Sequence, residues 1–278
     1  MKSIVRILVL AAALIAAVAC GQKQKKESQK MLVLYYSQTG VTQTVAQQIA
    51  DALGADIEAI VPVEPYDGDF QATIGRCLQE REAGVLPEIL PLKADLATYD
   101  VIFLGYPIWF GTYAPPVITL LGQVDLSGKK VVPFCTFGSG GLESSILDLI
   151  ATQPDAEVLP GYGVRAARIE AAPKEIDRFL KAGGFLEGEV PAIEPFPEQH
   201  PVSEEEAAIF DAAVDGYPML HARATTVASR PHPDGVEYHF TAIDQPREAG
   251  PDLPPPGVLQ VYVLVEPGQT PVFTQVVR

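Results

Sequence analysis

The segment with the clearest chemical character is the hydroxyl-rich loop at residues 37–42, Ser-Gln-Thr-Gly-Val-Thr. It follows an apolar run and precedes a helical pattern, so a buried strand is predicted to lead through the loop into a helix. The hydroxyls of Ser37, Thr39 and Thr42 can donate to phosphate oxygens, and Gly40 allows close backbone approach. The first-turn N–H groups add the positive end of the helix dipole. The loop is therefore predicted either to bind a phosphate or only to cap the helix.

The composition of this loop argues against two common nucleotide sites. It carries no lysine or arginine, whereas Walker-type loops end in Gly-Lys-Ser/Thr. It also lacks the three-glycine fingerprint of dinucleotide-binding loops. Neutral donors are therefore expected to hold the phosphate.

Two further apolar segments end in loops that suit a flat aromatic ligand. The segment at 99–105 runs into Tyr-Pro-Ile-Trp-Phe-Gly at 106–111, which holds the single tryptophan, Trp109. The segment at 131–137 runs into Gly-Ser-Gly-Gly at 138–141. Aromatic side chains can stack on a ring, and the N–H groups of a glycine loop can bond its polar edge. The alternative is that the aromatics only border a core and the glycines only make a turn.

Together the three loops resemble the FMN sites of flavodoxin-like proteins, over residues 31–186. The first is similar to the signature Thr/Ser-x-Thr-Gly-x-Thr, and the second to the branch with a Gly-Tyr-Pro-Ile-Trp loop, although it lacks the acidic residues often found around the flavin. The resemblance implies a flavodoxin-like α/β fold with a doubly wound, five-stranded parallel sheet, bound FMN and redox activity. It assigns no catalytic residue. The residues that it assigns to FMN are Ser37, Gln38, Thr39, Gly40, Val41, Thr42, Pro107, Ile108, Trp109, Phe110, Gly111, Thr136, Gly138, Ser139, Gly140 and Gly141.

The surrounding pattern supplies the elements that must position these loops. Alternating strands and helices with short connections favour a parallel sheet with helices on both faces. In the segment at 61–69, which is predicted to be an ordered loop, Tyr66 is expected to pack rather than to reach a ligand. Strands are predicted at 31–36, 56–61, 100–105, 130–135 and 161–168, and helices at 42–53, 70–83, 115–121, 142–151 and 173–182.

The last third of the chain has a different composition. A proline-rich segment at 188–202 is predicted to be a stiff linker, and residues 203–278 a small α+β module similar in outline to cystatin-like folds. This module has four arginines, no lysine and eleven acidic residues, so it is expected to bind a partner protein or pack on the first domain rather than dock on a membrane. A capping box at 203–206 opens its helix, which runs to about 215; strands are predicted at 219–228, 236–243, 258–266 and 272–277.

Residues 1–20 resemble a bacterial lipoprotein signal. Two basic residues precede an apolar run that is short for a membrane span and ends in Ala-Val-Ala-Cys. Cleavage before Cys20 and lipidation of its sulfur are expected, with an ordinary signal peptide or an uncleaved anchor as alternatives. Residues 21–30 are then a polar tether and residues 31–187 the FMN-binding domain. The expected location is the cell envelope, with the protein anchored to a membrane by lipid.

Charge and cysteine content limit the remaining possibilities. A net charge of -15 argues against nucleic acid as a partner, because phosphates would be repelled. No cluster of histidine, cysteine and carboxylate residues has metal-ligand spacing. Apart from the lipidated residue, Cys77 and Cys135 are expected as buried free thiols, with a disulfide in an oxidising compartment as the alternative.

The leading functional hypothesis is an exported flavoprotein that transfers electrons through FMN. Its expected partner is a redox protein or a small-molecule electron acceptor. The alternatives are an FMN-dependent NAD(P)H:quinone-type oxidoreductase and a cofactor-free interaction scaffold. A nicotinamide dinucleotide would need cations for its phosphates, and the predicted site has few candidates, namely Arg76, Arg81, Arg165 and Arg168.

Overall fold

The computed structural model describes residues 29–217, 219–245 and 257–278 of the 278-residue chain. The predicted signal segment with its Cys20, and most of the predicted tether, lie outside these residues. Within the described ranges, no helix combines the length and the apolar character needed to cross a bilayer.

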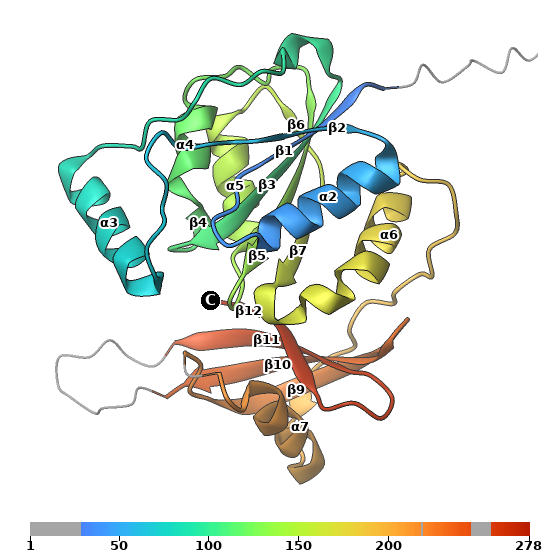
Figure 1. Cartoon of the computed structure of the whole chain (residues 1–278). Coiled ribbons are helices and arrows are strands. Elements are labelled where there is room, and N and C mark those ends of the chain that lie inside the picture. Colours follow the sequence, from blue (N-terminus) through green and yellow to red (C-terminus); the bar gives the residue numbers. More distant parts are fainter. Residues whose placement is uncertain (1–28, 218, 246–256) are drawn as a thin grey trace, which may run out of the picture.

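The first sheet is parallel and has the strand order β2-β1-β3-β5, with a fifth position beside β5 (Figure 1). Two short strands share that position, because β6 pairs with the start of β5 and β7 with its end. This arrangement confirms the predicted five-stranded, doubly wound parallel sheet. The strands are β1 (Met31–Tyr35), β2 (Asp56–Ala59), β3 (Val101–Trp109), β5 (Lys130–Phe137), β6 (Glu157–Val158) and β7 (Tyr162–Arg165).

Helices cover both faces of this sheet. The helices α2 (Val41–Leu53) and α6 (Ala172–Ala182) pack on one face, and α4 (Pro115–Leu121) and α5 (Leu142–Thr152) pack on the other. Successive strand residues point to opposite faces, so Val33 belongs to the first core and Leu34 to the second. The sheet is therefore buried on both sides, as its continuous apolar strands predict.

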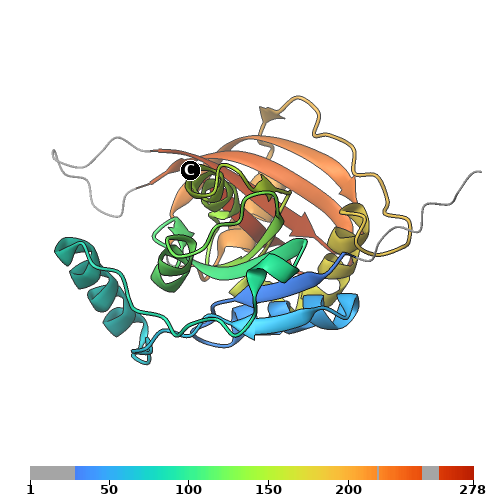
Figure 2. The same ribbon diagram turned by 90° about the horizontal axis from the view of Figure 1, so that it is seen from above.

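The remaining helix of this part, α3 (Phe70–Ala83), stands apart from the two layers (Figure 2). Thr73 and Cys77 are its buried residues. Cys77 and Cys135 are both buried free thiols, as predicted. All five predicted helices are confirmed to within one residue at each end.

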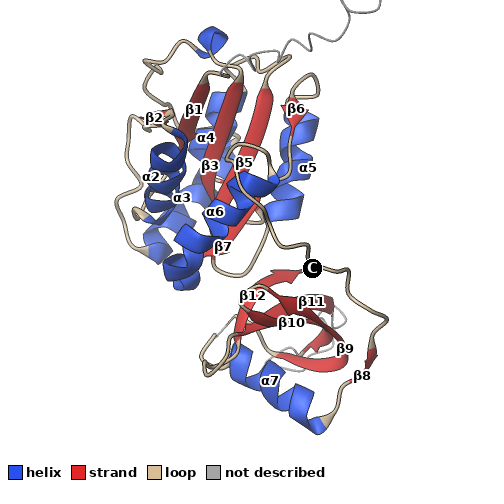
Figure 3. Cartoon of the chain, turned by 90° about the vertical axis from the view of Figure 1, so that its right-hand side faces the viewer, coloured by secondary structure: helices blue, strands red, loops and turns tan. Residues whose placement is uncertain are grey.

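The second sheet is an antiparallel meander with the order β12-β11-β10-β9-β8 (Figure 3). The helix α7 (Glu204–Val214) packs on it, with the rings of Phe210 and Phe240 5.2 Å apart. The predicted capping box is confirmed, since Ser203 and Glu206 bond each other reciprocally. The strands are β8 (His200–Pro201), β9 (Ala222–His232), β10 (Gly235–Asp244), β11 (Val258–Val265) and β12 (Val272–Val277).

The predicted linker lies along the second sheet. The ring of Phe196 is 5.3 Å from that of His239. The side chain of Gln199 donates to the His239 carbonyl and accepts hydrogen bonds from Thr226 and Thr241. These contacts hold the segment in place, so its path depends on packing as well as on its prolines.

Candidate functional site

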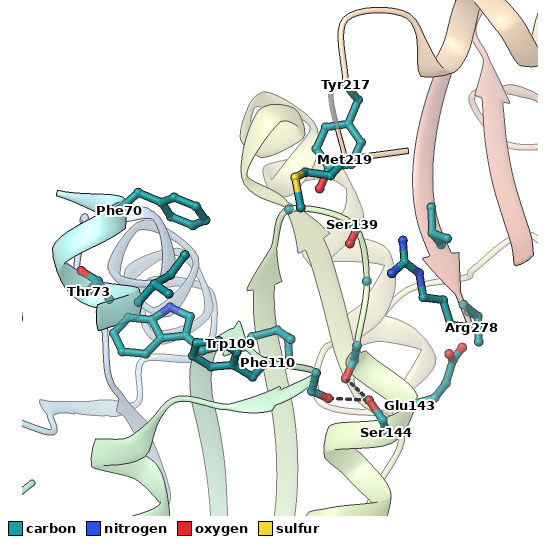
Figure 4. A pocket seen from close by; sticks show the side chains of 18 of the residues that line it. Phe70, Thr73, Trp109, Phe110, Ser139, Glu143, Ser144, Tyr217, Met219 and Arg278 are labelled. Atoms are coloured by element: carbon teal, nitrogen blue, oxygen red, sulfur yellow. Dashed lines mark hydrogen bonds between the residues drawn. The ribbon is translucent and has the colours of Figure 1, made fainter. Parts of the chain in front are cut away.

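The three loops noted in the sequence converge at the carboxyl edge of the first sheet. The strand order reverses between β1 and β3, and open α/β sheets bind ligands at such a switch point. A cavity of about 690 Å³ lies there (Figure 4). The predicted site residues that line it are Gln38, Ile108, Trp109, Phe110, Gly111, Gly138, Ser139, Gly140 and Gly141.

The first loop leaves the amino end of α2 open. Its N-cap residue, Gly40, has φ 87°, and no side chain caps this helix among the described residues. Instead, the N–H of Gly40 donates to the hydroxyl of Ser37 over 3.1 Å, which holds the loop in shape. Thr39 is exposed at the tip of the loop. Among the described residues, no side-chain cap therefore competes for the first-turn N–H groups of α2.

Two threonines predicted as ligand contacts bond each other below the loops. The hydroxyl oxygens of Thr42 and Thr136 are 2.8 Å apart, and both residues are buried. This hydrogen bond ties the first turn of α2 to the end of β5. Together with Ser37, Thr39, Gly40, Val41 and Pro107, these two threonines lie outside the cavity lining.

The second loop is a tight hairpin. The prediction that its strand ends at residue 105 was wrong, because β3 continues to Trp109 and then pairs with β4 (Thr112–Tyr113). The two turn residues, Phe110 and Gly111, have φ values of 51° and 85°, which is the left-handed geometry of a two-residue hairpin loop. Phe110 is 58% exposed beside the cavity. The turn between β3 and β4, and not burial of the side chain, therefore holds Phe110 beside the cavity.

Trp109 is held in position by two tyrosines. Its ring meets Tyr36 and Tyr66 edge-on, at centroid distances of 5.8 and 5.2 Å. The hydroxyl of Tyr66 donates to Glu80 over 2.6 Å, and the guanidinium of Arg76 lies 3.9 Å from the centre of the Tyr66 ring. Burial and the bond to Glu80 raise the pKa of Tyr66, so it stays protonated. The predicted packing role of Tyr66 is confirmed.

The third loop needs its glycines because other chain segments approach closely. A Cβ on Gly140 would lie 2.2 Å from the carbonyl oxygen of Val276. Gly141 has φ 114°, and a Cβ there would lie 2.6 Å from Ile108. These glycines therefore permit contacts with β12 and with the hairpin in addition to making a turn.

Sequence reasoning missed over half of the lining. Thr73 of α3 could have been inferred only through Gln38, whose side-chain amide donates to its hydroxyl over 2.7 Å. The missed residues come from α3, from α5, from the segment before β9 and from the end of β12, none of which carries a recognisable ligand motif. Phe70, Met219 and Leu147 are between 66% and 73% exposed. The missed residues are Phe70, Thr73, Ile74, Glu143, Ser144, Leu147, Tyr217, Met219, Val276, Val277 and Arg278.

The chemistry of the lining suits a planar ligand with one polar edge. Aromatic and aliphatic side chains form most of the walls, and Glu143 and Arg278 are the charged residues among those that line the cavity. Ser144 bonds the carbonyls of Gly111 and Gly141, which joins the second loop to the third. Across the described ranges, no group of three or more histidine, cysteine or carboxylate side chains could hold a metal ion.

Known proteins are similar to part of this chain. The sequence model of the family described as Flavodoxin matches residues 30–176. NAD(P)H dehydrogenase (quinone) 3 of Rhizobium meliloti is 32% identical over 127 residues, which cover 42% of this chain and 58% of that protein. NAD(P)H dehydrogenase (quinone) of Gluconacetobacter diazotrophicus is 29% identical over 135 residues, which cover 44% of this chain and 64% of that protein. The chain thus spans less than two thirds of either relative.

Solved structures also match. A protein of Bacteroides eggerthii is 33% identical with a TM-score of 0.45, covering 54% of this chain and 98% of that one. A flavoprotein of Lactobacillus acidophilus, solved in complex with FMN, is 26% identical with a TM-score of 0.45. The match covers 49% of this chain and 93% of that one.

Proposed function

Because the chain belongs to the flavodoxin family, we propose that it binds FMN at the carboxyl edge of the first sheet and transfers electrons through it. Flavodoxin-like sheets of this strand order hold FMN at the switch point between the first and third strands. The observation that carries the proposal is that an uncapped helix, an aromatic hairpin and a glycine loop meet at that point.

The donor set of the first loop fits a phosphate ester. First-turn N–H groups of α2 and the hydroxyls of Ser37 and Thr39 are neutral donors, and the space where a Gly40 Cβ would point is open. Trp109 and Ile108 line the cavity and would offer apolar walls to the flavin ring, and the backbone of residues 138–141, which also lines it, would supply hydrogen bonds to the polar edge of the ring. The flavin would supply the redox chemistry, while stacking, hydrogen bonds and nearby charge would set its potential.

We expect the soluble fragment from Met31 onward to bind FMN at least about tenfold more tightly than riboflavin. Riboflavin lacks the phosphate, and a hydrogen bond to a charged group contributes about 1.5 to 3 kcal/mol. The single tryptophan, Trp109, lines the cavity and serves as the reporter, so FMN titration should quench its emission strongly. Equal affinity for the two flavins would contradict the phosphate assignment, and undiminished emission at saturation would place Trp109 away from the ring.

Two threonines of the same region give a matched pair for this measurement. Thr39→Ala should weaken FMN binding several-fold and leave riboflavin binding unchanged. Thr44→Ala is the control, because Thr44 is exposed one turn further along and donates back to the Gly40 carbonyl within its own helix. Thr42 is unsuitable, since its removal would also deprive Thr136 of its partner.

We also propose that Cys20 anchors the protein to a membrane of the cell envelope through covalent lipid. The support is the sequence of residues 1–20 described above. We expect Cys20→Ser to leave the precursor unprocessed or to release the protein from the detergent phase, because several acyl chains anchor firmly whereas one anchors marginally. Mass spectrometry and detergent partitioning provide the measurement, and unchanged mass and partitioning would refute the lipid anchor.

The second candidate function is an FMN-dependent NAD(P)H:quinone-type oxidoreductase. The names of the two curated relatives favour it. In either case the partner is a redox protein or a small-molecule electron acceptor. The two functions differ in the electron donor.

A further inference from the structure

The second sheet contributes to the same cavity as the three loops. Tyr217 and Met219, which precede β9, and Arg278, which follows β12, lie at the cavity (Figure 4). Val276 and Val277 of β12 line it as well. The sequence predicts these residues only as parts of an added module. They lie beside residues 138–141, and specific contacts hold the module in this position.

The end of β12 is bonded directly to the glycine loop. The N–H of Val276 donates to the carbonyl of Ser139 over 2.6 Å. The backbones approach so closely at Gly140 that any side chain at this position would displace the strand. The hydroxyl of Tyr217 would lie 3.2 Å from a Cβ on Gly138. The loop is thus in contact with the module on its outer side and with the cavity on its inner side.

Arg165, the last residue of β7, joins the same two parts of the structure. Its Nε donates to the Gly138 carbonyl over 2.8 Å, and its Nη1 donates to the Phe273 carbonyl of β12 over 2.9 Å. Its guanidinium carbon also lies 3.3 Å from the centre of the Phe273 ring. Burial lowers the pKa of Arg165 to about 10, so the side chain is still charged at neutral pH. Burying a charged guanidinium costs free energy unless hydrogen bonds or ring contacts compensate it. Here the carbonyl and the ring of Phe273 in β12 supply part of that compensation.

Ion pairs attach the module at a second place, away from the cavity. Arg178 of α6 forms a bidentate pair with Asp234, at 3.0 and 2.6 Å. Lys174 lies 3.2 Å from Glu266 and 3.4 Å from Asp234. Two separated attachments restrict rocking of the module over the carboxyl edge.

We propose that the C-terminal module is part of the flavin site, with Tyr217, Met219 and β12 as one wall and Arg165 as the positioning residue that holds this wall in place. The inference rests on the proposed FMN binding. It assigns a role to the module that the flavodoxin core alone does not require.

Met219→Ala in the otherwise intact soluble chain tests the wall. Met219 is exposed, so its removal leaves the module folded, but it should weaken FMN binding about fivefold because apolar contact with the ring is lost. The absorption spectrum of the bound flavin should shift as well. Val258→Ala is the matched control, because Val258 is 56% exposed in the same module and is not a lining residue. Val258→Ala should change neither the FMN affinity nor the absorption spectrum of the bound flavin.

Arg165→Met and Arg165→Lys test the positioning residue. Arg165→Met should weaken FMN binding and shift the flavin spectrum in the same direction as Met219→Ala, and Arg165→Lys should restore part of both. A merely structural role would lower thermal stability without moving the spectrum. Wild-type affinity and spectrum in Met219→Ala, or in a folded Arg165→Met, would overturn the inference. Failure of the wild type itself to bind FMN would instead overturn the proposed function.

Discussion

Gly141→Ala should weaken FMN binding by at least about tenfold and lower thermal stability, because it strains two loops of the site at once. Gly141 has φ 114°, in the left-handed region that favours glycine. The added Cβ would also lie 2.6 Å from Ile108, on the hairpin arm that ends in Trp109. Either the glycine loop or the hairpin must move. The measurement is FMN titration by Trp109 emission, together with thermal unfolding.

The control for this variant is another glycine with a positive φ. Gly128 has φ 73° and open space where a Cβ would point. It precedes β5, at the amino edge of the sheet, where its N–H donates to the Asp155 carbonyl. Gly128→Ala should carry a strain cost of about 1 kcal/mol in stability and leave FMN affinity unchanged. Equal losses of affinity in the two variants would show that general destabilisation, rather than loop geometry, is responsible.

The sequence predicts the helices well where the signals are local, but two further strand predictions were wrong in their bounds. The strand predicted at 161–168 is β7 only over Tyr162–Arg165, and a 3-10 helix follows it at Ala166–Ala171. The strand predicted at 219–228 spans Ala222–His232. The bounds of α3 follow from Asp69, whose side chain accepts from the Ala72 N–H, and from Gly84, whose φ of 65° ends the helix. The helix α4 begins at paired prolines and ends before Gly122, which keeps a right-handed helical conformation and whose N–H donates to the Ile118 carbonyl. The three loops are identifiable because each follows an apolar strand directly. These features depend on neighbours within a few residues.

The parts that could not be predicted depend on contacts between distant residues. The extension of β3 to Trp109 needs pairing with β4 and β5 in register. The hydrogen bond between Thr42 of α2 and Thr136 of β5 joins residues 94 positions apart. Arg165 in the sequence is a candidate for dinucleotide phosphate, whereas in the structure it bonds a carbonyl 108 residues away. No local pattern encodes such a pairing, so the contribution of the module to the cavity emerges only from the fold.

The electron donor distinguishes the electron-transfer function from the oxidoreductase function. We expect NADH and NADPH to reduce the bound FMN at least about 100-fold more slowly than dithionite does. This ratio corresponds to a difference of about 2.7 kcal/mol in the activation free energy. Hydride transfer requires the nicotinamide to stack within about 3 to 3.5 Å of the flavin ring. The phosphates of the dinucleotide must then be held by cations or by N–H groups near the cavity.

The cations considered from the sequence are either bonded elsewhere or lie away from the cavity lining. Arg76 pairs with Glu80 at 2.8 Å, and Arg168 pairs with Glu175 at 2.7 Å. Arg81 lies in the last turn of α3, whereas the lining residues of that helix are in its first two turns. Arg278 is the cation that remains among the lining residues, and Glu143 lines the same cavity with opposite charge. A dinucleotide would therefore find little electrostatic support, consistent with a net charge of -15 for the whole chain.

Anaerobic stopped-flow absorbance of the FMN-loaded protein gives the measurement. Dithionite or a low-potential protein donor should bleach the flavin rapidly, and either nicotinamide should do so slowly and without saturation. Arg278→Gln provides a check on the argument, because removal of the one lining cation should leave the slow nicotinamide rate unchanged if no dinucleotide site exists. Rapid, saturable reduction by NADH or NADPH that Arg278→Gln impairs would establish the oxidoreductase function and identify the residue that holds the dinucleotide.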